Sequence, residues 1–122
     1  MPSSSSHFSF LPTKQGFLGL DMTDGFSYEQ AKVVIVPFGL EASVSYQGGT
    51  SSGPQAMIEA SHEVELFDED LWCEAYRAFK PLTLKPPRIH PKLPQALQQL
   101  ETIVRQLLDD SKFPMVFGGE HS

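Results

Sequence analysis

The chain has 122 residues, which is normal for one domain, with 40% hydrophobic residues and a formal net charge of −6. The hydrophobic content argues against a disordered chain, and the excess of acids argues against nucleic acid as a partner, because phosphates need basic surfaces. No apolar run has the length of a membrane span and no secretory signal is recognisable. The single cysteine, Cys73, excludes an internal disulfide, so we expect a cytoplasmic protein that binds neither membrane nor nucleic acid.

The first half of the chain predicts a tail, a strand, a loop and a short helix. Residues 1–15 are rich in Ser and Pro and predict a flexible tail. Residues 33–36 (Val-Val-Ile-Val), followed by a proline, are typical of a central parallel strand that is buried on both faces. Residues 38–53 form a polar loop with four glycines. A Gly-Pro pair then opens a short helix over residues 53–60, because Gly is an acceptable N-cap and Pro fits the first helical position.

The second half predicts two more strands and a longer helix. Residues 64–67 partly alternate, which indicates a second strand near an edge of the sheet. Four prolines over residues 86–94 mark a connection, and Pro94 opens a helix with an apolar stripe. Residues 113–117 form the third strand. The stripe comprises Leu97, Leu100, Ile103, Val104, Leu107 and Leu108. This succession predicts an α/β fold in which a parallel sheet lies between helices on both faces, in three layers.

The run Gly118-Gly119-Glu120-His121-Ser122 carries an acid and an imidazole off the carboxyl end of the third strand. Ligands bind at that edge in open α/β sheets, and a mixed nitrogen and oxygen ligand set suits manganese. His121 is therefore a candidate metal ligand, and Glu120 either orients the site or faces solvent. The remaining histidines have no second ligand at helical or hairpin spacing, which favours surface or structural roles; they are His7, His62 and His90.

Three segments, in this order, resemble the agmatinase branch of the arginase (ureohydrolase) family. The first covers residues 33–46, with Val-Val-Ile-Val-Pro-Phe, Glu41 and Ser-Val-Ser-Tyr. The second is Gly-Thr-Ser-Ser-Gly-Pro-Gln-Ala-Met-Ile-Glu-Ala-Ser at residues 49–61, which continues into Glu-Leu-Phe-Asp-Glu-Asp at residues 65–70. The third is the Gly-Gly-Glu-His-Ser run, which resembles the family's first metal-ligand motif, with Glu120 where the family commonly has aspartate.

The resemblance implies an arginase-like fold. It also implies the hydrolysis of agmatine by water to putrescine and urea, with two manganese ions as cofactors. It implies that His121 is a ligand of one ion. It also places the loop after the first strand at the mouth of the site, so Glu41, Ser45 and Tyr46 surround the pocket or contact another subunit. A loop stabilised only by its own turns remains the alternative. The aspartate-rich motifs that supply the family's other metal ligands are not found in these residues.

We therefore expect residues 16–122 to be the N-terminal portion of a single ureohydrolase domain, incomplete at Ser122 and inactive alone. The complete protein would bind a small guanidino substrate, whose exact identity stays open, and would form a homo-oligomer. The alternative is a non-catalytic half-domain that acts as a partner or structural module of a separately encoded remainder. In either case the third strand should expose an unpaired apolar edge, which predicts aggregation or a loosely packed state of the isolated chain.

Overall fold

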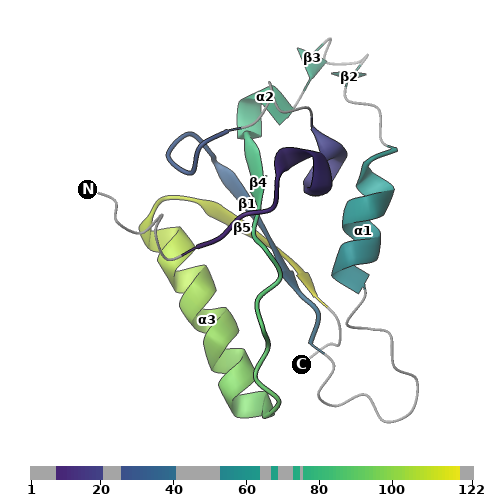
Figure 1. The fold of residues 1–122 in the computed structure, drawn as a ribbon. Helices are drawn as coiled ribbons and strands as arrows, with labels where there is room; N and C mark the ends of the chain where they lie inside the picture. Colours follow the sequence, from purple (N-terminus) through teal and green to yellow (C-terminus); the bar gives the residue numbers. More distant parts are fainter. Residues whose placement is uncertain are drawn as a thin grey trace.

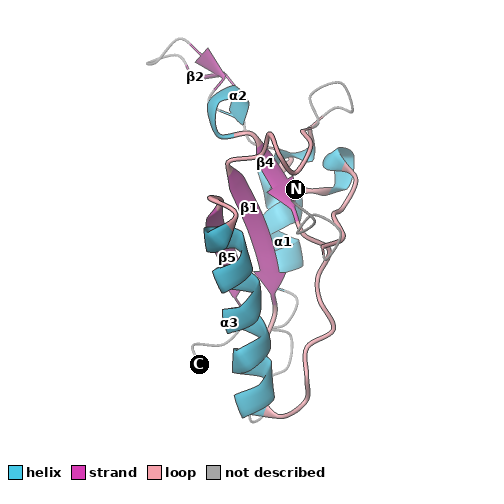
Figure 2. Ribbon diagram, turned by 90° about the vertical axis from the view of Figure 1, so that its left-hand side faces the viewer, coloured by secondary structure: helices cyan, strands magenta, loops and turns pink. Residues whose placement is uncertain are grey.

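The computed structural model describes residues 8–20, 26–40, 53–63, 67–68, 73–74 and 76–118. A three-stranded parallel sheet lies between helix α1 on one face and helix α3 on the other (Figures 1 and 2). This is the α/β architecture that the sequence predicts. In chain order the elements are η2 (Thr13–Gln15), η3 (Phe17–Gly19), β1 (Val33–Phe38), α1 (Gly53–Ser61), β2 (Phe67–Asp68), β3 (Cys73–Glu74), α2 (Tyr76–Phe79), β4 (Pro81–Thr83), α3 (Leu93–Asp109) and β5 (Phe113–Gly118).

Strand β1 is the centre of the sheet, whose order is β4-β1-β5. Val33 lies opposite both Pro81 and Phe113, and both neighbours run parallel to β1. The prediction of a buried central strand is thus confirmed. Pro37 is tolerated there because its nitrogen points to the β4 side: the carbonyl of Ile35, two residues earlier, accepts the N–H of Leu84. That side has no registered pair beyond Ile35, so the ladder loses no donor.

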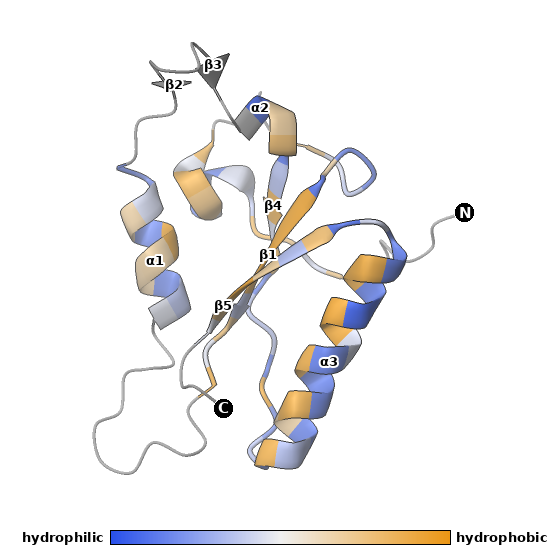
Figure 3. Ribbon diagram, turned by 180° about the vertical axis from the view of Figure 1, so that it is seen from behind, coloured by the Kyte–Doolittle hydropathy of each residue, from blue (hydrophilic) through white to orange (hydrophobic). Residues whose placement is uncertain are grey.

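The side chains of β1 alternate between two apolar layers because successive strand residues point to opposite faces. Val34, Val36 and Phe38 are buried in one cluster with Ala96 and Leu107 of α3. The opposite face carries Ile35, which is fully buried, and α1 contributes its own fully buried Ile58. Figure 3 shows β1 as hydrophobic along nearly its whole length, as two-sided burial requires.

Helix α3 begins one residue before the predicted Pro94 and carries the predicted apolar stripe against the sheet. Leu107 is fully buried, and Leu100 and Ile103 pack against the same cluster. Leu97 and Leu108, at the margins of the stripe, are 36% and 58% exposed. Over the described ranges, no helix combines the length and apolar character needed to cross a membrane.

The second strand of the sheet is not where the sequence places it. Phe67–Asp68 pairs antiparallel with Cys73–Glu74 in a separate ribbon, and residues 64–66 lie outside the described residues. The sheet position beside β1 is taken by Pro81–Thr83. Of the strand predicted at 64–67, only Phe67 is described, and it lies in this ribbon rather than in the sheet. The strand Pro81–Thr83 was not predicted, because three residues that begin with proline carry no periodicity of their own. They become a strand only because β1 and the N-terminal segment bind them on either side.

Residues 8–11 run along the outer edge of β4, where the sequence predicts a flexible tail. The N–H of Leu11 donates to the carbonyl of Thr83 (2.9 Å), and the N–H of Lys85 donates to that of Ser9 (2.9 Å). Phe8 and Phe10 hold this segment down, because their rings stack in tilted geometry on Tyr28, with centroids 6.0 and 5.6 Å away. The remainder of the predicted tail, residues 1–7, lies outside the described residues.

The next turn of the chain crosses the α1 face of the sheet very closely. The N–H of Phe17 donates to the hydroxyl of buried Thr83 (2.8 Å), and a Cβ on Gly16 would lie only 2.7 Å from that oxygen. Glycine is required at this position because any side chain would push the segment off the sheet. Ser61 at the end of α1 accepts the N–H of Leu18 (2.7 Å), so the turn is fastened to α1 as well.

The buried lysine Lys112 lies at the edge of the sheet where the strands begin. The ammonium of Lys112 donates to the carbonyls of Tyr28, Glu29 and Ala31, and it lies 4.6 Å from the centroid of the Tyr28 ring. The Tyr28 hydroxyl in turn donates to Asp110 (2.5 Å). We call these contacts the Lys112 clamp. It joins the segment that enters β1 to the turn between α3 and β5.

Because the clamp contains Tyr28, the stability that it contributes decreases at alkaline pH. Burial raises the pKa of Tyr28 above its ordinary value of about 10, and the hydrogen bond to Asp110 and its negative charge raise it further. The raised pKa means that the folded state favours the protonated phenol. The stability gained is therefore complete below pH ~10 and is lost as the pH rises towards the higher folded pKa.

We expect the free energy of unfolding to fall above pH ~10 by up to about 1.4 kcal/mol per pH unit more in the wild type than in Tyr28→Phe. The variant is a matched control because it keeps the ring and Lys112, while Asp110 still accepts hydrogen bonds from Gln106 (3.2 and 3.3 Å). Denaturant titrations between pH 8 and 11 measure the difference. Parallel curves for the two proteins would contradict this assignment.

A candidate site at the carboxyl edge of the sheet

Strands β1 and β5 end side by side. They pair in parallel over their whole length, with Phe38 opposite Gly118 as the last pair (Figure 1). The carboxyl edge of a parallel sheet is where backbone leaves the ladder and side chains become free to bind ligands. The sequence-predicted candidates follow these two strands in the chain, and the structure shows that the two strands end at the same edge of the sheet.

The candidate residues themselves lie outside the described residues. Three of them, Glu41, Ser45 and Tyr46, belong to the segment after β1. The other two, Glu120 and His121, follow β5 within three residues of Gly118. Their assignment to a metal site and its surround therefore stays a prediction, and the structure contributes the position of the two strand ends that carry them.

Both ends of the loop over residues 41–52 are anchored beside the end of β5. Leu40, just before the loop, is buried in the cluster that includes Phe38. Gly53, just after it, starts α1, and a Cβ at Gly53 would lie 3.6 Å from the carbonyl oxygen of Gly118. This approach of α1 to the strand end was not apparent from the sequence. It means that the segment over residues 41–52 starts and finishes at the edge of the sheet where β5 ends.

An aromatic contact supports the end of β5 from the α1 face. Phe117, the residue before Gly118, meets Phe17 of η3 edge-on, with ring centroids 5.6 Å apart. Such a contact contributes about 0.5–1.5 kcal/mol beyond its buried area. The end of β5 is thus held by its pairing with β1 and, on the α1 face, by the ring of Phe17.

The described histidines have structural roles, as predicted. His62 lies with Nε2 2.8 Å from the carbonyl oxygen of Gly16, which assigns the proton to Nε2 because a carbonyl only accepts. His90 is exposed, and its Nδ1 accepts the N–H of Lys92 (3.1 Å). No three His, Cys, Asp or Glu side chains gather as metal ligands anywhere in residues 8–118 that the structure describes. That part of the chain alone does not form a metal centre.

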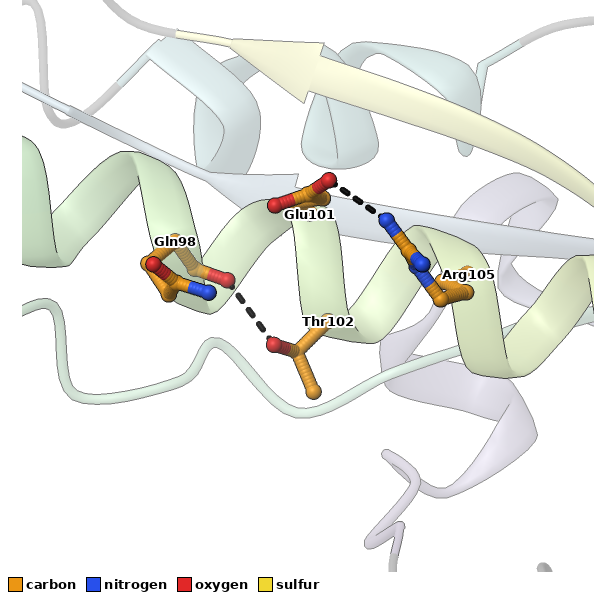
Figure 4. Close-up of polar contacts among 4 residues, drawn as sticks. All are labelled: Gln98, Glu101, Thr102 and Arg105. Atoms are coloured by element: carbon orange, nitrogen blue, oxygen red, sulfur yellow. Dashed lines mark hydrogen bonds and ion pairs between the residues drawn. The ribbon is translucent and has the colours of Figure 1, made fainter.

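A groove of about 490 Å³ lies on the amino-terminal half of α3. It is lined by Pro94, Gln95, Gln98, Gln99, Thr102 and Ile103. No carboxylate, thiol or imidazole lines it, so it offers a cation no anionic or imidazole ligand, and it offers no general base. Neighbouring polar groups on α3 are already paired: Thr102 donates to the carbonyl of Gln98 (2.9 Å), and Arg105 binds Glu101 (2.6 Å) (Figure 4).

Comparison with known proteins shows which family the chain is similar to. The model of the arginase family matches residues 31–122. An N(1)-aminopropylagmatine ureohydrolase of Synechocystis is 35% identical over 101 residues, which are 79% of this chain and 33% of that protein. An agmatinase of Bacillus cereus is 33% identical over 97 residues, 78% of this chain and 33% of that protein.

A solved structure has the same fold. The agmatine ureohydrolase of Thermoplasma volcanium is similar with a TM-score of 0.70 and 22% identity, over 99% of this chain and 38% of that chain. The chain thus spans about a third of the length of the curated relatives that it matches.

Proposed function

Because the chain belongs to the arginase family, we propose that it is the N-terminal part of a manganese-dependent ureohydrolase. The proposed reaction is the hydrolysis of agmatine to putrescine and urea in the cytoplasm, catalysed by the complete protein as a homo-oligomer. The observation that carries the proposal is the family match, which covers residues 31–122 and so includes β5 and the Gly-Gly-Glu-His-Ser run in the sequence.

The guanidino carbon explains why this chemistry needs a metal. Resonance over three nitrogens protects it from attack by water, and bound manganese supplies a Lewis acid that makes water a stronger nucleophile. We propose His121 as one manganese ligand, supplied from the end of β5. Its imidazole would be joined by carboxylates from the family's aspartate-rich motifs, which are not found in residues 1–122.

We further propose roles for the neighbouring predicted residues. Glu120 precedes the proposed ligand and would orient it through a hydrogen bond, as residues adjacent to metal ligands commonly do. Glu41, Ser45 and Tyr46 would surround the substrate pocket. The support is that their loop leaves the sheet at Phe38 and returns at Gly53, on both occasions next to Gly118.

Agmatine and N(1)-aminopropylagmatine should be compared directly as substrates. The relatives include an agmatinase and an enzyme named for the longer compound, and their identities to this chain are nearly equal. The test is urea release from each compound by the complete protein with manganese. Release from agmatine at a higher kcat/KM supports the proposal as stated. Release only from the longer compound would change the substrate, and release from neither would overturn the function.

Residues 1–122 alone should release no urea from agmatine, even with excess manganese. One proposed ligand cannot hold a catalytic ion against water, and the described residues add no further ligand set. The matched control is His121→Ala in the same chain, which should give the same background. Turnover of the unmodified chain clearly above that control would contradict the prediction.

A further inference from the structure

The short turn over residues 16–19, which contains η3, is fixed to two other elements at once, and we call it the Phe17 turn. The N–H of Phe17 donates to the hydroxyl of Thr83 in β4 (2.8 Å), and the N–H of Leu18 donates to that of Ser61 at the end of α1 (2.7 Å). Both acceptor residues are buried. Because different elements hold two successive backbone donors, the backbone of Phe17 cannot shift without breaking a hydrogen bond to the sheet or to α1.

The Phe17 turn also contains strained backbone. Leu18 has a φ of +71°, in the left-handed region that residues with a side chain rarely adopt, and Gly19 follows with a φ of +57°. His62, just after α1, supports the turn: its Nε2 lies 2.8 Å from the carbonyl oxygen of Gly16, and a Cβ on Gly19 would lie 2.9 Å from its ring. Such strain persists only where the surrounding structure determines it, and it is frequent at functional sites. The contacts with β4 and α1 therefore offset a local cost, and the group that they hold in place is the ring of Phe17.

The ring of Phe17 lies against the carboxyl end of β5. It meets the ring of Phe117 edge-on, with centroids 5.6 Å apart, on the α1 face of the sheet. Phe117 is half-buried there, whereas Phe113 and Met115, on the same face of β5, are 61% and 40% exposed. The contact with the Phe17 turn thus falls on the last residue of β5 that has a side chain.

The support at Phe117 matters because the backbone after it has no side chain to pack. Gly118 ends β5 opposite Phe38, and a Cβ added to Gly118 would meet nothing within 4 Å. Gly119 follows in the sequence, so two glycines separate Phe117 from the residues that lead to the proposed ligand His121. Glycine backbone can adopt many directions at little steric cost. The direction in which the chain leaves the sheet therefore depends on how firmly β5 is held at Phe117.

We propose that Phe17 is a positioning residue, which acts through Phe117 to set the direction of the Gly-Gly-Glu-His-Ser run as it leaves β5. Phe17 acts on the end of the strand and not by touching the substrate. The Phe17 turn would transmit the positions of β4 and α1 to the carboxyl edge of the sheet, which makes the N-terminal segment part of the support of the site. The proposal rests on the proposed function only for the role of that run.

Amide hydrogen exchange of the complete protein tests the positioning directly in Phe17→Leu, which keeps an apolar side chain but removes the ring. The N–H of Phe113 donates to the carbonyl of Lys32 (2.8 Å). By alternation, the amides of Met115 and Phe117 also point towards β1. Exchange at Phe117 should become at least about tenfold faster in the variant, because the end of the strand opens more often. Met115 is the internal reference, and its exchange relative to that of Phe117 excludes a merely global loss of stability.

Phe10→Leu is the matched control for this experiment. It removes a ring contact with the same centroid distance, 5.6 Å to Tyr28, from the same N-terminal segment but on the α3 face of the sheet. It should lower the free energy of unfolding by a similar amount and leave exchange at Phe117 unchanged. Equal exchange at Phe117 in the two variants would overturn the proposal. If Phe17→Leu does not fold, Phe117→Leu breaks the same contact from the strand side and is compared with the control in the same way.

Urea release by the complete protein, from whichever of the two compounds it hydrolyses, measures the effect on the site. In Phe17→Leu, kcat should fall by about tenfold or more while KM stays within about twofold, because a misplaced site slows the reaction without weakening substrate binding. Phe10→Leu should keep both constants. An unchanged kcat in Phe17→Leu would overturn the proposal even if exchange at Phe117 is faster. If the wild type releases no urea, the proposed function fails, and exchange at Phe117 alone decides whether Phe17 positions the end of β5.

Discussion

His121→Ala in the complete protein should lower urea release from agmatine by more than ~100-fold. Replacing even an outer-shell partner of a metal ligand commonly costs about 10–100-fold in affinity or activity, and the loss of a direct ligand should cost more. The affected ion should be held much more weakly than the other, which keeps its own carboxylates. Metal content after dialysis and the rate of urea release measure the two effects together.

His90→Ala is the matched control for that experiment. His90 is an exposed histidine whose Nδ1 accepts the N–H of Lys92, so its loss should leave both ions and the rate of urea release unchanged. If the His121→Ala protein retained both manganese ions and full activity like this control, His121 would not be a ligand. The proposed role of the carboxyl edge would then have to rest on other residues.

Lys112→Ala should destabilise the fold by about 2–4 kcal/mol, the largest loss of stability that we expect from one polar residue here. The change leaves the buried carbonyls of Tyr28 and Ala31 without their donor and removes the cation from the Tyr28 ring. Water replaces such a donor poorly in a packed site, so the cost comes from unpaired acceptors. The free energy of unfolding of the complete protein, from a denaturant titration, measures it.

Two further variants identify the cause of that loss. Lys112→Met keeps the apolar stem, so most of the destabilisation should remain if the unpaired carbonyls are responsible. Lys92→Ala removes an exposed lysine that makes no side-chain cap at the start of α3, and it should change stability by less than about 0.5 kcal/mol. Equal and small effects at Lys112 and Lys92 would show that the Lys112 clamp contributes little.

Elements with a strong pattern of their own could be predicted from the sequence. Strand β1 follows from its uninterrupted β-branched run, and α3 follows from leucines at helical spacing after a proline. Strand β4 could not be predicted, because Pro81–Thr83 is a strand only through its neighbours. The buried position of Lys112 could not be predicted for the same reason. Its acceptors lie more than eighty residues earlier in the chain, and no local pattern distinguishes it from a surface lysine.

The candidate site, too, could be predicted from the sequence only in part. Its location at the carboxyl edge is predicted from the order of strands and from the Gly-Gly run that starts at Gly118, the last residue of β5. The structure shows that β1 and β5 end together there, with Phe38 opposite Gly118. The approach of Gly53 to Gly118 depends on how α1 packs across the sheet, which spacing along the chain does not encode. The positions of Glu120 and His121 lie outside the described residues and stay predictions.

The central place of β1 has a consequence for biosynthesis. Val33 is translated first, but its partners Pro81 and Phe113 come about 50 and about 80 residues later. At a synthesis rate of about 5–20 residues per second, the wait for β5 lasts about 4–16 s. Throughout that time the apolar strand β1 lacks a paired strand on one side or on both, while the nascent chain already leaves the ribosome. The risk of aggregation is therefore highest during translation, and cellular yield should respond more to translation speed and chaperones than to the stability of the finished fold.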